Sequence, residues 1–253
     1  MSEVLTERRG QLLLITLNRP DARNAVNASL AEQLAAGLDE LDGDQTLRVG
    51  VLTGAGKGFS AGMDLKAFVK GESPHVGDRG FAGITRRAAE KPLIAAIEGF
   101  AVAGGLEIAL SCDLIVAASD ARLGIAEVKR GLVAAAGALF RLPQRIPYAA
   151  AMELALTGDF IDGTRAYELG LVNRATEPGK ALDTALELAE AVAQNAPLAL
   201  AASKRIVAGA PGWDEAEAWR QSDEIGGPVM ASEDAREGAT AFAEKRPPEW
   251  KGR

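Results

Sequence analysis

Residues 99–107 read Gly-Phe-Ala-Val-Ala-Gly-Gly-Leu-Glu, and the prediction of the fold starts from this stretch. Its paired glycines, Gly104 and Gly105, precede an apolar run that continues to about Cys112, so we expect a helix to begin at the pair. The short apolar run 93–97 just before it predicts a buried strand. A buried strand followed by a glycine-opened helix is typical of an α/β protein.

Further strands and helices alternate on both sides of this stretch. Asn27 is suited to cap a helix that ends near Gly43. Further strands are expected at 12–17, 49–53, 114–118 and 122–124. Later helices are expected at 147–156, 164–169, 180–194, 197–208, 213–225 and 232–243. The order predicts a sheet-containing core over residues 1–195 and a helical C-terminal region over residues 196–253.

The composition excludes several classes of function. The chain has 253 residues and a net charge of −7, which argues against a general nucleic-acid binder. One cysteine and one histidine leave no Cys- or His-rich metal site and no internal disulfide, so we expect no metal cofactor. No apolar run approaches the length of about 20 residues that spans a bilayer, and the first ten residues do not look like a signal peptide. We therefore expect a soluble, cytoplasmic protein that binds no membrane.

Several tempting motifs fail on inspection. The glycine loop 54–58 lacks the Ser or Thr of a P-loop and the glycine spacing of a dinucleotide-binding turn. Ser60 or Ser111 would need a base such as His75 to act as a nucleophile. That histidine falls in residues 70–83, which have no periodicity and are expected to form a mobile loop. Cys112 ends an apolar run and is expected to be a buried core residue.

Three segments remain that can carry chemistry, namely 58–66, 99–107 and 124–132. The first two are glycine-lined turns, and each can offer a free backbone N–H to one carbonyl oxygen. Such a pair forms an oxyanion hole that stabilises an enolate. Glu107 lies one helical turn beyond Gly104, and Glu127 lies in the third segment. Two carboxyl groups beside an oxyanion hole suit proton transfer next to a carbonyl group.

Both glutamates also have a purely structural interpretation. Glu107 in the first turn of a helix would complement the helix dipole. Glu127 would form an exposed ion pair with Lys129 or Arg130. The spacing alone leaves these interpretations open.

Taken together, the motifs resemble the crotonase superfamily, whose prototype is enoyl-CoA hydratase, over nearly the whole chain. The resemblance runs in order through short motifs at residues 18–20, 24–25, 62–65, 91–96, 104–107, 156–158, 170–172 and 242–246. It implies a spiral of ββα units with a helical C-terminal trimerisation region, and trimers that pair into hexamers. It also implies a role in fatty-acid or other lipid metabolism.

The resemblance assigns roles to individual residues. It places the two oxyanion-hole amides at Met63 and Gly104 and the acid/base pair at Glu107 and Glu127. Ala61, Gly62, Asp64, Leu65 and Lys66 would line the path of the acyl-CoA substrate. Lys57 or Lys66 would lie near its phosphates, and Lys245, Arg246 or Lys251 from the tail would also contribute. Coenzyme A enters as part of the substrate, so no separate cofactor is implied.

Retention of both acids favours addition of water to a 2-enoyl-CoA thioester, with Glu107 as base and Glu127 as acid. The chain departs from typical short-chain hydratases at Ala103 and over residues 132–137, which lie beside the expected acyl pocket. The tail from Ser232 onward resembles a branch that includes carnitinyl-CoA dehydratase, which keeps non-fatty acyl groups and a steroid side-chain thioester open. The resemblance is also compatible with an enoyl-CoA isomerase and with a non-catalytic acyl-CoA-binding protein.

Overall fold

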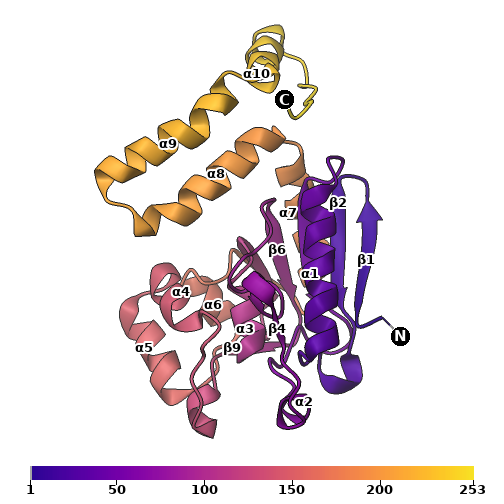
Figure 1. The fold of residues 1–253 in the computed structure, drawn as a ribbon, viewed down its shortest axis with the longest axis vertical. Helices are drawn as coiled ribbons and strands as arrows, with labels where there is room; N and C mark the ends of the chain where they lie inside the picture. The colour runs from indigo at the N-terminus through magenta and orange to yellow at the C-terminus, as the bar shows by residue number, and fades with distance from the viewer. Residues whose placement is uncertain (1) are drawn as a thin grey trace.

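A six-stranded sheet forms the centre of the computed structural model, which describes residues 2–253 (Figure 1). Only the pairing of β1 with β2 is antiparallel, and the other neighbours run parallel. In spatial order the strands are β1 (Val4–Arg9), β2 (Leu12–Leu17), β3 (Val49–Gly54), β6 (Leu93–Ile97), β8 (Leu114–Ala118) and β10 (Arg174–Thr176). The central strands are almost wholly buried, as their continuous apolar runs predict. The predicted α/β class is confirmed.

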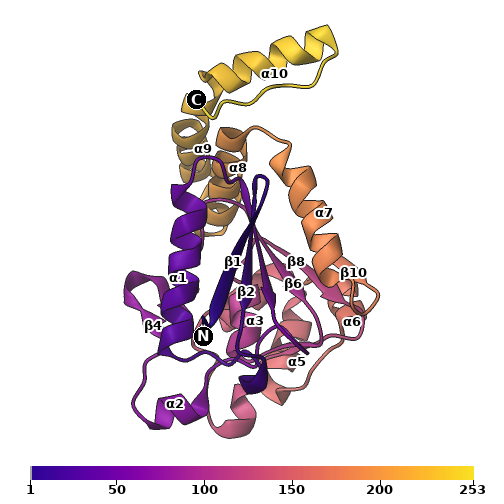
Figure 2. The ribbon, with the colours of Figure 1, turned by 90° about the vertical axis from the view of Figure 1, so that its right-hand side faces the viewer.

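Helices cover both faces of this sheet (Figure 2). Alternate residues of β2 point to opposite faces, so Leu13 packs with α1 (Ala28–Gly43) and Leu14 packs with α7 (Ala181–Ala193). Helix α7 presents one stripe of four alanines to the sheet. These are Ala181, Ala185, Ala189 and Ala193. Their small side chains let the helix backbone approach the strands closely.

A small second layer brings the functional segments together. Strand β7 (Phe100–Val102) pairs in parallel with β9 (Arg122–Gly124), and single bridges join Ser60 to Ala101 and Val26 to Met63. Helix α3 (Gly104–Ala109) leaves this layer directly after β7, and it ends three residues before Cys112. The layer therefore places the 60–63 turn next to the start of α3.

The remaining elements correct several predictions. Residues 70–83, predicted to be a mobile loop, hold a short hairpin of β4 (His75–Val76) and β5 (Gly80–Phe81), in which Arg79 and Phe81 are buried. The segment thus has regular structure that the prediction lacked, and its mobility stays a prediction. The prediction also missed α4 (Ala138–Arg145), whose internal proline disguises it. Strands β1, β7 and β10 were missed as well. Also present are α2 (Leu65–Val69), the 3-10 turn η3 (Glu127–Arg130), α5 (Tyr148–Thr157) and α6 (Gly163–Glu168).

Three C-terminal helices form an arm that extends away from the sheet (Figures 1 and 2). They are α8 (Pro197–Gly209), α9 (Glu215–Met230) and α10 (Glu233–Glu244), so the predicted helices are present and α9 ends five residues later than expected. The arm exposes Val207, Trp219, Met230 and Phe242. Its role in trimerisation, and the division of the chain at residue 195, stay predictions. Among residues 2–253 no helix is long and apolar enough to cross a membrane.

Candidate active site

Two backbone amides converge where the 60–63 turn meets the start of α3. The N–H groups of Met63 and Gly104 have no acceptor within residues 2–253. The two turns touch, because a methyl group built on Gly62 would lie 2.7 Å from the nitrogen of Gly104. Both Met63 and Gly104 line a cavity of about 240 Å³. The predicted pair of donors is therefore brought together and left free at the wall of a cavity.

The residue before Gly104 holds an unusual backbone conformation. Ala103 has φ 52° and ψ −129°, a region that glycine adopts readily and alanine avoids. Its own N–H donates to the carbonyl of Gly124 at 2.9 Å, which fixes the turn from the β9 side. Such strain costs on the order of 1–3 kcal/mol and persists where the surrounding structure overrides it. Here it aims the first amide of α3 into the cavity.

Glu107 is held by the loop that precedes α4. Its side chain is 3 % exposed, and one oxygen accepts N–H bonds from Ala136 at 2.8 Å and Ala138 at 3.1 Å. Burial raises the pKa of this carboxyl, while the amide donors and Arg141 partly oppose the rise. The carboxylate is thus fixed by groups far along the chain and lines the cavity, which a dipole-complementing role alone does not explain.

The carboxyl group of Glu127, unlike that of Glu107, has a buried oxygen that is not held by amide donors. It is half-buried at the start of η3, and its Oε2 is buried without a hydrogen-bond partner in the described chain. Burial raises the pKa of Glu127 to about 7, and the nearby charge of Glu107 adds to the rise. Lys129 pairs with Asp159 instead. The interpretation of Glu127 as one half of an exposed ion pair is therefore wrong.

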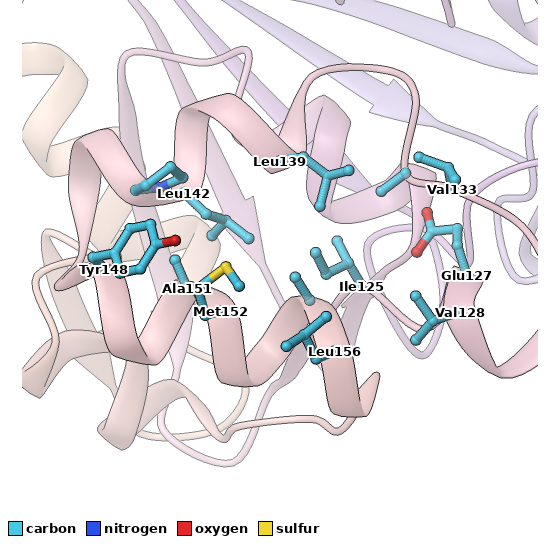
Figure 3. Close-up of a pocket in the computed structure, with 13 residues that line it drawn as sticks. Ile125, Glu127, Val128, Val133, Leu139, Leu142, Tyr148, Ala151, Met152 and Leu156 are labelled. Carbon is cyan, nitrogen blue, oxygen red and sulfur yellow. The ribbon is translucent and has the colours of Figure 1, made fainter.

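A second, apolar cavity adjoins the first at Glu127 and Val133. It has a volume of about 360 Å³ and lies between α4, α5 and η3. Figure 3 shows Glu127 at one end and Tyr148 at the other. Its other lining side chains are apolar, and they include Ile125, Leu139, Leu142, Ala151, Met152 and Leu156. The carboxyl group of Glu127 thus lies where the cavity that contains Glu107 and the two amides meets the apolar one.

The other predicted substrate-binding residues take varied positions. Ala61 and Leu65 line the first cavity, and so do His75, which is exposed, and Arg130. Asp64 does not line the cavity; its carboxylate caps α2 and pairs with Arg19.

The predicted phosphate-binding cations lie outside this cavity. Lys57 and Lys66 are exposed. Lys245, Arg246 and Lys251 follow α10, and α10 and the C-terminus lie at the end of the molecule away from α3 (Figure 1). Within one chain the tail therefore does not reach the site.

Sequence reasoning missed the amides of Ala136 and Ala138, which hold Glu107. It also missed Phe81, which lines the cavity from β5. The only signal was that residues 132–137 lie near the expected water site, and nothing in the local pattern pairs them with Glu107.

Comparison with known proteins agrees with this geometry. The family described as "Enoyl-CoA hydratase/isomerase" matches residues 7–253. This chain belongs to that family. An enoyl-CoA hydratase of Mycobacterium tuberculosis is 43% identical, over 99% of this chain and 97% of that protein. A carnitinyl-CoA dehydratase of Salmonella arizonae is also 43% identical, over the full length of both.

The fold of this chain also matches that of a solved structure. A crystal structure of an enoyl-CoA hydratase from Mycobacterium tuberculosis superposes with a TM-score of 0.98 at 56% identity, covering all of both chains. The crotonase fold expected from the motifs is confirmed. The relatives in the enoyl-CoA hydratase/isomerase family include both a hydratase and a dehydratase. Membership of the family therefore gives the class of enzyme, and the acyl group of the substrate has to be argued from the cavities.

The raised pKa of Glu127 has a consequence for stability. Below about pH 4.5 this carboxyl is protonated in both states, and as pH rises through about 7 the folded protein must bury a charge that the unfolded chain leaves in water. Stability is therefore lost with rising pH. We expect Glu127→Gln to stabilise the protein at pH 8, relative to its effect at pH 4, by about 1–3 kcal/mol.

Urea unfolding of both proteins at pH 4 and pH 8 measures this difference. Glu153→Gln, on an exposed residue of α5, is the matched control and should show the same small change at both pH values. An equal effect of Glu127→Gln at the two pH values would contradict the buried, unpartnered state of its carboxyl.

Proposed function

We propose that this protein adds water across the 2,3 double bond of a 2-enoyl-CoA thioester. The observation that carries the proposal is the unpartnered Oε2 of Glu127, which lines one cavity with Glu107 and two free amides. An orphaned carboxyl oxygen in such a cavity is available to a substrate or to water. A structural ion pair would have left no such group.

The two amides act on the thioester. The N–H groups of Met63 and Gly104 donate to its carbonyl oxygen, and their bonds strengthen as negative charge collects there. This polarises the conjugated double bond toward attack at Cβ. The enolate-like transition state is stabilised more than the bound substrate is.

The two glutamates divide the proton transfers. Two amide donors favour the ionised form of Glu107, so we assign it as the base that takes a proton from water as the oxygen attacks Cβ. A pKa of about 7 keeps much of Glu127 protonated near neutral pH, so it donates its proton to Cα. Proton exchange with solvent then restores both groups. Because the two carboxyls interact, their titration belongs to the pair.

The apolar cavity supports an apolar acyl group. It extends away from Glu127, and its walls beyond that carboxyl are almost entirely aliphatic. A carnitinyl group would carry a quaternary ammonium ion into this space. Such ions are bound by several aromatic faces, and Tyr148 is the one aromatic side chain in the lining. The one carboxyl group there, Glu127, is the group to which we assign proton donation. We therefore place a fatty or other apolar enoyl group ahead of carnitinyl.

The absorbance of the conjugated enoyl thioester tests the proposal directly, because hydration removes it and dehydration produces it. The protein is given crotonyl-CoA and a longer 2-enoyl-CoA for hydration and carnitinyl-CoA for dehydration, and the products are identified by mass. Hydration of the two enoyl thioesters at rates well above that of carnitinyl-CoA dehydration is the expected result. Movement of the double bond without gain of water would replace the hydratase by an isomerase. Tight binding without turnover would replace it by a binding protein.

The cavity also predicts which change alters chain-length preference. Ala155 lines it from α5 and is partly buried, so Ala155→Phe should project a ring into the space. We expect kcat/KM for a ten-carbon enoyl-CoA to fall at least about tenfold, because a displaced apolar chain forfeits more than about 1.4 kcal/mol of burial. Crotonyl-CoA should lose less than threefold. Ala149→Phe, on the exposed side of the same helix, is the control and should change neither value.

A further inference from the structure

The hydroxyl group of Ser60 lies beneath the turn that carries the Met63 amide. Ser60 is fully buried, and its Oγ donates to the carbonyl of Asn24 at 2.8 Å. The same oxygen accepts the N–H of Gly62 at 3.1 Å. A serine hydroxyl can donate and accept at once, and both of its bonds here are buried.

Gly62 lies between two peptide planes that are fixed from different sides. The plane on its carboxyl side contains the Met63 N–H, and its carbonyl accepts the N–H of Val26 at 2.8 Å. In a trans peptide the N–H points opposite to the C=O, so this bond aims the Met63 amide away from Val26. The plane on the amino side of Gly62 is held by Ser60 Oγ.

Gly62 has φ +85°, and glycine is the residue whose backbone turns most freely. Without the hydroxyl, nothing described in the chain would accept the Gly62 N–H, and its plane could rotate about that residue. Rotation there would displace Gly62 and strain the Val26 bond that aims the Met63 amide. The direction of the Met63 amide therefore depends on the Ser60 hydroxyl as well as on Val26.

The anchor below Ser60 is itself rigid. Asn24 is 1 % exposed, and its side-chain nitrogen donates to the carbonyls of Ala55 and Gly58, each at 2.9 Å. Its backbone lies in the left-handed region at φ 52°, which asparagine tolerates better than most residues. The Asn24 carbonyl that receives the Ser60 proton is thus fixed in place.

Ser60 also contacts the segment that carries the second amide. Its carbonyl accepts the N–H of Val102 at 3.1 Å. It lies so close to the first turn of α3 that a methyl group on Gly105 would come within 2.1 Å of it. One buried residue thus touches the supports of both oxyanion-hole amides.

We propose that Ser60 is a positioning residue that sets the spacing and direction of the oxyanion-hole amides through the Asn24–Ser60–Gly62 hydrogen bonds. This inference rests on the proposed function only in that Met63 and Gly104 form an oxyanion hole. It makes the hydroxyl necessary for full activity although it touches neither water nor substrate. Loss of this hydroxyl should weaken stabilisation of negative charge on the thioester oxygen and leave substrate binding nearly intact.

Binding of acetoacetyl-CoA isolates this step, because its enolate absorbs in the near ultraviolet and no water addition is involved. We expect the wild type to lower the pH at which the bound ligand ionises, since a hole with two good donors favours the enolate. In Ser60→Ala this pH should rise by about one unit, which corresponds to a tenfold loss of enolate stabilisation. The kcat for crotonyl-CoA should fall about tenfold, part of the 10²–10³ that loss of a whole donor costs. KM should stay within about twofold.

Two further variants distinguish the positioning role of Ser60 from a general loss of stability. Ser60→Cys keeps a weak donor and acceptor and should fall between wild type and Ser60→Ala. Thr53→Val removes an equivalent buried bond, from its hydroxyl to the carbonyl of Ala96 at 3.0 Å, and should leave the bound-enolate spectrum unchanged.

An unchanged ionisation pH in a folded Ser60→Ala protein would overturn the positioning role, whatever happens to kcat. The same holds for a shift that Thr53→Val reproduces. Enolate stabilisation by a wild type that hydrates no enoyl-CoA would overturn the proposed function and leave the role of Ser60 standing. A wild type that stabilises no enolate would overturn both.

Discussion

Glu107→Gln and Glu127→Gln are each expected to lower kcat for hydration of crotonyl-CoA by about 10²–10⁴, the usual contribution of a positioned acid or base. A glutamine side chain keeps the shape of each group but neither takes a proton from water nor donates one to Cα. Both side chains line the same cavity, and each serves one half of the reaction. The double variant should lose little more than the worse single one, since groups that act as a unit are not additive.

Stopped-flow or steady-state absorbance measures these rates, with acyl-CoA affinity determined separately by calorimetry. Glu153→Gln supplies the control, because this glutamate is exposed on α5 and lines neither cavity. Retention of more than about a tenth of kcat in either active-site variant would contradict a mechanism with two essential carboxyl groups. If the variants keep their affinity for acyl-CoA while kcat falls, the two glutamates act in catalysis and not in substrate binding.

Gly62→Ala is expected to cost about 10²–10³ in kcat, as much as removal of one oxyanion-hole donor. Its methyl group would lie 2.7 Å from the nitrogen of Gly104 and 3.2 Å from the carbonyl oxygen of Val102. Both are backbone atoms, which cannot turn aside as a flexible side chain does. Relief of the contact must push the two amides apart, which is the distance on which the oxyanion hole depends.

The left-handed backbone of Gly62 would strain alanine even without this contact, and a matched control separates the two effects. Gly71 has φ +86°, nearly the φ +85° of Gly62, but a methyl group there would meet nothing within 4 Å. Gly71→Ala should therefore lose about 1 kcal/mol of stability and keep its kcat. Equal kinetic losses in the two variants would show that backbone strain, rather than the approach of Gly62 to Gly104, lowers the rate.

Much of this protein was predictable because its signals are local. Apolar runs predicted β2, β3, β6 and β8, since strands buried on both faces need no polar residues. The glycine pair predicted the start of α3 at Gly104. The two glutamates were singled out because no histidine or cysteine offered another acid/base group, and the resemblance to the crotonase superfamily assigned the two amides to Met63 and Gly104.

The predictions that failed concern elements whose local pattern is weak or misleading. Strands β7 and β10 have three residues each and show no period; β9, predicted at 122–124, is equally short. Pro143 inside α4 argues against a helix that the packing of Leu142 stabilises nonetheless. The hairpin at 75–81 is polar in sequence, yet Arg79 is buried through bonds to Asp39 and to the carbonyl of Arg87.

The amino-acid sequence by itself determined the fold class and the family, because both depend on residue types in short motifs along the chain, and it singled out two carboxyl groups whose roles the spacing left open. Only the tertiary structure decided how those groups behave. The free carboxyl oxygen of Glu127, the amides of Ala136 and Ala138 on Glu107, and the buried hydroxyl of Ser60 all depend on contacts between distant segments. A pKa and the direction of an amide are properties of the surroundings, and the surroundings exist only once the chain has folded.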